Sequence, residues 1–224
     1  GDGGFENGPT FEANGWTVIN SSPLGTTGTP GANTWHVGNA AGASAGTSGA
    51  YVSSTGGATW GYNNASATTS SFYRDVTSTS LTENILSLTF QWKGNGESGW
   101  DRLLVYAVPI ASATPGPNNP TSNSTIMQGV TGATLIYTQT TFPQAAYAQA
   151  AVIIPSTFVG TTFRLYFVFQ GDNSFGTSPG AADDEITYAR NTSAFDDVDL
   201  VPNVLRGVEN VDLSTTIFGK KLDA

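Results

Sequence analysis

The sequence contains no cysteine, which excludes a disulfide framework, a cysteine-ligated zinc site and thiol catalysis. Charged residues are scarce, at 11%, and the 8 Lys and Arg residues form no cluster in a chain whose net charge is -9. Such a chain repels nucleic acid and anionic lipid, so neither is an expected partner. No apolar stretch approaches the roughly 20 residues that span a bilayer, so membrane insertion is not expected.

Helix formers such as Glu, Lys, Arg and Met are also few, whereas Thr, Val and aromatic residues are plentiful. No segment shows a convincing helical period. The clearest pattern lies in residues 85–93, where Leu86, Leu88, Phe90 and Trp92 share one face and polar residues share the other. This alternation predicts a half-buried strand, and the composition predicts an all-β fold.

Strand signals recur along the chain between turn-rich stretches. Residues 162–170 repeat the alternation, and residues 102–110 and 148–154 are more continuously apolar, as expected of central strands covered on both faces. The other candidate strands are residues 16–20, 34–37, 50–53, 71–76, 134–141 and 195–201. About ten strands at this spacing are typical of sandwiches and jelly rolls. Long loops are expected over residues 111–128 and 171–193.

One domain is the better expectation for a chain of 224 residues. We place it at residues 1–201. The pattern weakens after Pro202, so residues 202–224 are expected to be a C-terminal extension or a linker.

Carboxylates carry most of the candidate chemistry. In the strand pattern at 195–201, Asp196 shares the face of Val198, whereas Asp197 faces the other way. A buried carboxylate is costly unless it is hydrogen-bonded, paired or bound to a metal. Glu6 would converge with Asp196 if the first and last strands are neighbours, and calcium suits such an oxygen-rich site. The alternative is that both carboxylates cap turns.

Aromatic residues in loops are candidates for ligand binding. Trp60 and Tyr62 lie between Gly and Asn residues, and Trp100 lies beside Gly99. Exposed rings there could stack on a sugar, although core packing is the more common role of a tryptophan. Three tryptophans lie in strand patterns and are predicted to be core residues: Trp16, Trp35 and Trp92.

Catalysis fits the sequence poorly. The only histidine, His36, sits in a predicted strand, and there is no Gly-x-Ser-x-Gly elbow and no His-Glu-x-x-His motif. A glycosidase needs only two suitably separated carboxylates, so that alternative stays open. We predict that the chain is not an enzyme.

A succession of short motifs carries a family resemblance. They are Phe5-Glu6-Asn7-Gly8, Asn14-Gly15-Trp16-Thr17-Val18, Trp35-His36-Val37-Gly38, Ser48-Gly49-Ala50-Tyr51-Val52-Ser53, Tyr73-Arg74-Asp75-Val76, Phe90-Gln91-Trp92-Lys93-Gly94-Asn95-Gly96-Glu97, Asp101-Arg102-Leu103-Leu104-Val105-Tyr106 and Phe195-Asp196-Asp197-Val198. In this order they resemble the cleaved-adhesin or choice-of-anchor J group of Bacteroidetes surface and secreted proteins, which is similar to MAM domains.

The resemblance implies a jelly-roll β-sandwich of two antiparallel sheets, secreted or at the cell surface, with structural Ca²⁺. It implies adhesion through a glycan or an extracellular protein; the alternative is a carbohydrate-binding accessory domain of a secreted hydrolase or peptidase. Glu6 and Asp196, with Asp197 beside it, match the metal ligands. Asp101 matches a further acidic position, grouped here with the metal ligands.

Two further segments bear on the resemblance. Asp172 and Asn173 resemble a loop motif and are taken as ligand-binding candidates. Residues 180–194 depart from the family pattern as an insertion with an acidic run from Asp183 to Glu185. The insertion is expected to be a solvated acidic loop; a second cation site or a partner-specific lip are the alternatives.

Overall fold

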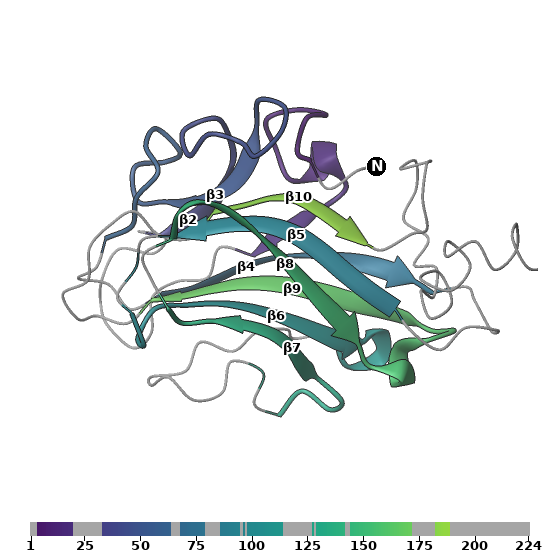
Figure 1. The fold of residues 1–224 in the computed structure, drawn as a ribbon. Coiled ribbons are helices and arrows are strands. Elements are labelled where there is room, and N and C mark those ends of the chain that lie inside the picture. The colour runs from purple at the N-terminus through teal and green to yellow at the C-terminus, as the bar shows by residue number, and fades with distance from the viewer. Residues whose placement is uncertain are drawn as a thin grey trace, which may run out of the picture.

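The computed structural model describes residues 4–19, 33–63, 68–78, 86–94, 96, 98–113, 127, 129–141 and 144–171, and the backbone of residues 182–188. They form two five-stranded antiparallel sheets, stacked in two layers (Figure 1). The predicted all-β sandwich is confirmed. No α-helix occurs within the described ranges, which contain three short 3-10 helices: η1 (Glu12–Asn14), η2 (Ile110–Ser112) and η3 (Ser156–Phe158).

The chain crosses repeatedly between the two sheets. The first sheet has the order β1 (Thr17–Ile19), β4 (Thr68–Thr77), β9 (Thr162–Gly171), β6 (Arg102–Pro109), β7 (Thr134–Gln139). The second has the order β2 (Thr34–Gly38), β3 (Gly49–Ser53), β10 (Ala182–Tyr188), β5 (Leu86–Gly94), β8 (Gln144–Ile154). Nine of these strands overlap the strands that the sequence predicts.

The core lies between the sheets and is rich in aromatic rings. Phe72 of β4 stacks on Phe167 of β9 with ring centroids 5.1 Å apart. The Trp35 ring meets Phe72 edge-on at 4.9 Å, and its Nε1 donates a hydrogen bond to the Ser70 carbonyl at 3.0 Å. Burial confirms the three predicted core tryptophans, Trp16, Trp35 and Trp92. Such edge-to-face contacts add specificity to the apolar burial.

The first sheet is also covered on its outer face. A second apolar cluster gathers there, made of Leu104, Val108, Ala113, Met127, Tyr166 and Val168. Its members come from β6, β9 and the connection between β6 and β7. The prediction that β6 is an inner strand covered on both faces is therefore confirmed.

The same prediction is wrong for β8. This strand lies at the edge of the second sheet, and its Ile153 side chain is 66% exposed. The run of Ala, Val and Ile in its sequence resembles a central strand because alanine is small and uninformative about which face is buried.

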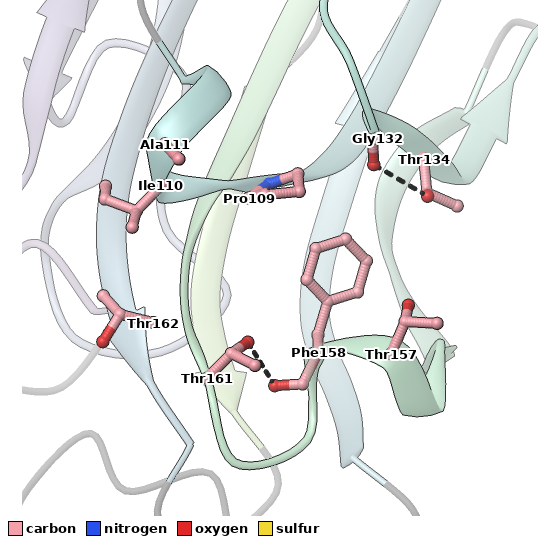
Figure 2. A pocket seen from close by; sticks show the side chains of 9 residues that line it. All are labelled: Pro109, Ile110, Ala111, Gly132, Thr134, Thr157, Phe158, Thr161 and Thr162. Atoms are coloured by element: carbon pink, nitrogen blue, oxygen red, sulfur yellow. Dashed lines mark hydrogen bonds between the residues drawn. The ribbon is translucent and has the colours of Figure 1, made fainter.

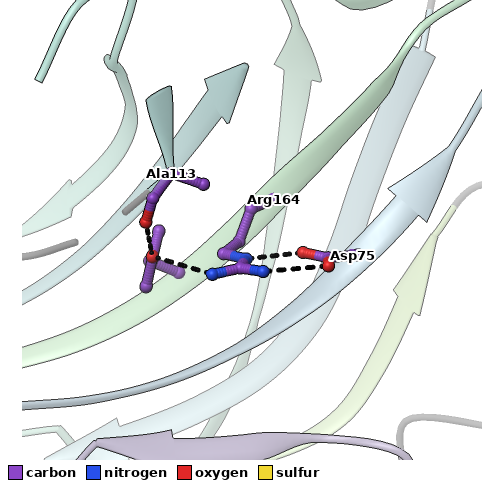
Figure 3. Close-up of polar contacts among 4 residues, drawn as sticks. Asp75, Ala113 and Arg164 are labelled. Carbon is purple, nitrogen blue, oxygen red and sulfur yellow. Dashed lines mark hydrogen bonds and ion pairs between the residues drawn. The ribbon is translucent and has the colours of Figure 1, made fainter. Parts of the chain in front are cut away.

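A polar network crosses the outer face of the first sheet (Figure 3). Arg164 of β9 forms a two-point ion pair with Asp75 of β4, with Nε–Oδ1 at 2.5 Å and Nη2–Oδ2 at 2.9 Å. The Tyr166 hydroxyl donates to the Ala113 carbonyl at 2.6 Å. The Arg164 guanidinium also lies 3.9 Å from the centroid of the Tyr73 ring. The hydrogen bonds that Arg164 donates to the Asp75 carboxylate are the main cause that raises the pKa of Arg164.

The tenth strand corrects one expectation. β10, at Ala182–Tyr188, lies inside residues 171–193, expected to be a long loop, and inside residues 180–194, expected to be an acidic insertion loop. It occupies the place between β3 and β5 (Figure 1). Asp183 pairs with Ala50 on one side and with Trp92 on the other. The two neighbouring strands supply backbone hydrogen bonds on both sides, which outweighs the weak strand propensity of acidic residues. The strand expected at 195–201 and the extension 202–224 lie outside the described residues.

Candidate functional site

Glu6 is presented by a tightly folded N-terminal segment. Phe5 is fully buried, packs edge-on against Phe11 at 5.8 Å, and has a φ of 57°, a left-handed conformation uncommon outside glycine. The buried Asn14 side chain closes the segment, because its Oδ1 accepts the Asn7 N–H at 2.9 Å and its Nδ2 donates to two backbone carbonyls. Buried aromatic packing and hydrogen bonding thus fix the position of Glu6.

The Glu6 carboxylate bonds to the loop before β3. Its Oε1 accepts the N–H groups of Thr47 at 2.8 Å and Ser48 at 2.7 Å, and its Oε2 accepts the Thr47 hydroxyl at 2.8 Å. The Ser48 N–H, followed by the two Thr47 donors, lowers the pKa of Glu6. Oε1 is fully engaged, so Oε2 has the remaining lone pair of this carboxylate that could face a cation.

The described residues contain no group of three or more His, Cys, Asp or Glu side chains that could hold a metal ion. Asp196 and Asp197 lie outside the described residues, as do Asp172 and Asn173. The calcium site therefore stays a prediction, and within the described part of the chain Glu6 ties the N-terminal segment to a loop.

Asp101 lies elsewhere in a buried polar contact. Its side chain is 1% exposed and accepts a hydrogen bond from the Tyr62 hydroxyl. The Tyr62 ring is 5% exposed and lies 5.3 Å from the ring of Phe169. A Cβ on Gly96 would lie 2.7 Å from the Asp101 carboxylate, so only glycine fits at this position of the turn. The exposed platform predicted at Tyr62 is wrong, because the ring is in the core and its hydroxyl satisfies a buried carboxylate.

Trp100, next to Asp101, is the exposed aromatic of this turn, with 50% of its surface accessible. The preceding Gly99 has a φ of 88° and donates its N–H to the Thr140 carbonyl at 2.6 Å. The Ser98 hydroxyl donates to the same carbonyl at 3.4 Å. The turn is thus anchored on one side to Thr140 and on the other through buried Asp101, which presents the Trp100 ring from a fixed backbone.

Trp60 belongs to a different arrangement, the cation–aromatic cluster of Trp60, Lys93 and Tyr147. The Lys93 Nζ lies 4.4 Å from the centroid of the Trp60 ring and 4.6 Å from that of Tyr147. It also donates to the Ala41 carbonyl, and the Tyr147 hydroxyl donates to the Gly42 carbonyl at 2.9 Å. One ammonium between two rings is a stabilising contact, which holds Trp60 half-buried. The Trp60 ring is therefore clamped, that is, held by its contact with Lys93, whereas the Trp100 ring is exposed.

Strand register places Trp100 and this cluster at the same end of the sandwich. β5 ends at Gly94, which pairs with Gln144 at the start of β8. The turn that carries Trp100 leads from β5 into β6 and is bonded to Thr140, which follows β7. We name this end, with Trp60, Lys93, Trp100 and Tyr147, the aromatic end.

His36 occupies a structural position in β2. Its Nε2 hydrogen-bonds with the Thr34 hydroxyl at 2.8 Å, and its ring centroid lies 6.2 Å from that of Tyr51. Partial burial lowers the pKa of His36, which favours the neutral ring. Neither contact supplies the serine and carboxylate partners that a hydrolytic triad requires.

Sequence reasoning missed the partners of the predicted site residues. The alternation of β5 places Lys93 on the face opposite Trp92, but Trp60 and Tyr147 lie far away in sequence. The one signal available for Asp101 and Tyr62 is the rule that a buried carboxylate needs a hydrogen-bond partner. This rule does not identify which residue donates.

The C-terminal part of the chain matches a family of another kind. The sequence pattern of the FMN-dependent dehydrogenases matches residues 171–224, which are 54 of the 224 residues. Over 52 residues the chain is 52% identical to an L-lactate oxidase from Lacticaseibacillus rhamnosus, covering 23% of this chain and 14% of that protein. Over 42 residues it is 52% identical to the oxidase FUB9 of Gibberella fujikuroi, covering 19% and 12%. The chain thus spans less than a sixth of these curated relatives.

This match includes β10 and the motif Phe195-Asp196-Asp197-Val198, which contributed to the adhesin resemblance. The match begins before the domain boundary that is expected after residue 201. That boundary stays a prediction.

Among solved structures, the chain is similar to β-sandwich domains. It is 19% identical to the K1 cleaved adhesin domain of Lys-gingipain from Porphyromonas gingivalis, over 85% of this chain and 98% of that one, with a TM-score of 0.44. It is 11% identical to a carbohydrate-binding module of the β-sandwich superfamily, over 84% and 63%, with a TM-score of 0.48. It is 14% identical to the module TmCBM61, solved with β-1,4-galactotriose, over 84% and 95%, with a TM-score of 0.46.

At these identities and scores the solved structures define no ligand for this chain, and the fold assignment rests on the strand pairing. None of the helices in the described ranges has the length and apolar character needed to cross a membrane.

Proposed function

We propose that the chain is a non-catalytic, extracellular binding module that takes glycans at the aromatic end, with the Trp100 ring as the stacking platform. The observation that carries the proposal is a half-exposed indole on a backbone anchored at both sides. Exposing so large an apolar ring to water is unfavourable, and its apolar face and polar edge suit the face of a sugar ring. The fixed turn reduces the entropy lost when a ligand binds.

The surroundings of Trp100 support a polar ligand. The cation–aromatic cluster at the same end adds the Tyr147 and Trp60 rings and the Lys93 ammonium. The net charge of -9 disfavours the binding of polyanions, so neutral glycans are the expected ligands.

A glycan array followed by calorimetric titration of the best polysaccharide tests this proposal. Trp100→Ala is expected to weaken binding about tenfold, or ~1–2 kcal/mol, the usual value of a well-placed aromatic contact. Leu135→Ala is the matched control, because Leu135 is a similarly exposed apolar side chain, 46% accessible, on β7. Equal affinity of Trp100→Ala and wild type would refute the proposal.

Adhesion to an extracellular protein is the competing outcome of the same screen. If no glycan binds while immobilised matrix proteins do, the module is an adhesin for proteins and the glycan proposal is wrong. Trp100→Ala would then be tested on the protein ligand.

A second candidate function follows from the match at residues 171–224. The sandwich would be an accessory module joined to an FMN-dependent oxidoreductase, and it would hold that enzyme at a surface. The protein isolated from its native source would then carry a flavin absorption spectrum and oxidise a 2-hydroxy acid such as L-lactate. Native protein free of flavin and of this oxidase activity would eliminate the candidate.

Calcium remains part of the proposal, supported by the open lone pair on Glu6 Oε2 and by the adjacent carboxylates expected at Asp196 and Asp197. Thermal melting with calcium and with EDTA tests it. A bound structural ion raises the melting temperature, and Asp196→Asn should remove that increase. Identical melting curves with calcium and with EDTA would refute it.

A further inference from the structure

A cavity of about 440 Å³, drawn in Figure 2, opens beside Pro109 at the end of β6. β6 runs from Arg102, beside Trp100, to Pro109, beside the cavity, so the two lie about 25 Å apart along the strand. Three elements meet around it: η2 after β6, η3 between β8 and β9, and the start of β7. The cavity therefore lies where the chain passes from the second sheet to the first.

The walls of this cavity are mainly apolar. The Phe158 ring points into the space between Pro109 and Thr134, with Ile110 and Ala111 on the adjoining wall (Figure 2). Ile110 is 41% exposed, so part of the apolar surface is open to water. The volume is in the range of pockets that hold small ligands.

The wall beside Pro109 depends on Gly132. Its φ is 74°, and a Cβ at this position would lie 2.9 Å from the Pro109 Cγ. Glycine therefore allows this close approach and keeps the cavity open on that side.

Threonine hydroxyls give the cavity its polar character. The Thr161 hydroxyl donates to the Phe158 carbonyl at 2.8 Å, and the Thr134 hydroxyl donates to the Gly132 carbonyl at 3.3 Å. Their protons are thus engaged, while their oxygens can still accept hydrogen bonds. The hydroxyl of Thr157, an exposed residue of η3, has no hydrogen-bond partner among the residues that the structure describes. None of the nine lining residues is charged.

We propose that this cavity is a second, independent sugar site, which takes a neutral monosaccharide unit that carries a methyl group. Apolar walls suit a methyl group, as in a deoxy, O-methyl or N-acetyl sugar, and hydroxyl oxygens suit the O–H donors of the ring. A charged sugar would lose its hydration with no counter-charge in the lining. The biological role of this site rests on the proposed glycan function; its chemistry does not.

Saturation-transfer NMR on the full chain tests the site, with N-acetylglucosamine and methyl fucoside as probes and glucuronate as the charged comparison. We expect transfer to be strongest at the methyl protons of the two neutral sugars and absent for glucuronate. Thr157→Trp fills the cavity and should weaken neutral-sugar binding at least about tenfold. Ser156→Trp, at the neighbouring exposed position outside the lining, should bind as wild type does.

The outcomes separate this inference from the proposed function. Trp100→Ala should leave monosaccharide binding at the cavity unchanged, and Thr157→Trp should leave polysaccharide binding at the aromatic end unchanged. No transfer to either neutral sugar at about 50 mM, far above a millimolar dissociation constant, would overturn the inference. So would equal binding by Thr157→Trp and Ser156→Trp.

Discussion

Nine strands of the sandwich come from residues 17–171, and the tenth, β10, comes from the segment that matches FMN-dependent dehydrogenases. In the first region, β5 shows the alternation most clearly, because its buried and half-buried residues alternate over nine positions. β10 has the sequence Ala-Asp-Asp-Glu-Ile-Thr-Tyr, with three consecutive acids. The comparison shows that alternation in the sequence can mark a strand such as β5, whereas β10 is recognised from its backbone pairing with β3 and β5.

The largest change in stability is expected when a core ring is removed from the first region. Phe72 is fully buried and touches Trp16, Trp35 and Phe167. Phe72→Ala should destabilise the fold by about 3–5 kcal/mol, because it loses burial and leaves a cavity. Urea unfolding measures the change, with the exposed Leu135→Ala as control at within about 0.5 kcal/mol of wild type. If Phe72→Ala lost no more stability than the control, burial of this ring would not be what stabilises the first region.

A backbone change in β10 tests the second region. Asp183 pairs with strands on both sides, so Asp183→Pro removes an N–H from the interior of a sheet. We expect a loss of about 2–3 kcal/mol in unfolding free energy. Asp183→Ala keeps the N–H and is the matched control. If proline and alanine have the same effect, the backbone of β10 does not stabilise the second sheet.

A smaller effect is expected at the ion pair on the outside of the first sheet. Asp75 is 43% exposed and Arg164 is 15% exposed, so solvent screens the pair. A double-mutant cycle with Asp75→Asn and Arg164→Gln should give a coupling free energy of about 0.5–1 kcal/mol. The coupling should decline in 1 M salt, where charges are screened within about 3 Å. A salt-independent coupling would assign the contact to packing on Tyr73.

The smallest effect is expected on the melting temperature in acid. The pKa of Glu6 is lowered in the folded state, so its contribution is fully present above its ordinary value of 4.5 and is lost as the pH falls through the folded pKa. Between about pH 6 and pH 3, wild type should lose melting temperature more steeply than Glu6→Gln. Parallel profiles would mean that the bonds to Thr47 and Ser48 do not favour the charged form.

Much of the fold could be predicted from the sequence because burial leaves a period of two in the strands. Phe163, Leu165, Phe167 and Phe169 repeat on the core face of β9 as the pattern predicts, although Tyr166 and Val168 on the other face are buried as well. β10 could not be predicted in this way, because its pairing depends on two strands that approach from distant parts of the chain.

The site was harder to predict because aromatic residues in loops look alike in a sequence. Tyr62, Trp60 and Trp100 all follow or precede glycine or asparagine, yet one is buried, one is clamped and one is exposed. The difference comes from Asp101, a buried acceptor in the turn before β6, and from Lys93, a cation on β5. The cavity at Pro109 has no sequence signal, since its lining comes from β6, η2, β7, η3 and β9.

The position of β8 has a consequence for handling the protein. This strand, Gln144–Ile154, is eleven residues long and pairs with β5 on one side, while no described strand pairs with its other edge. It contains no charge and no proline, which are two of the devices with which natural sheets block edge-to-edge association. Concentrated solutions are therefore prone to aggregation through β8. A lysine at the exposed position Ala151 would be the least invasive means of keeping the protein monodisperse.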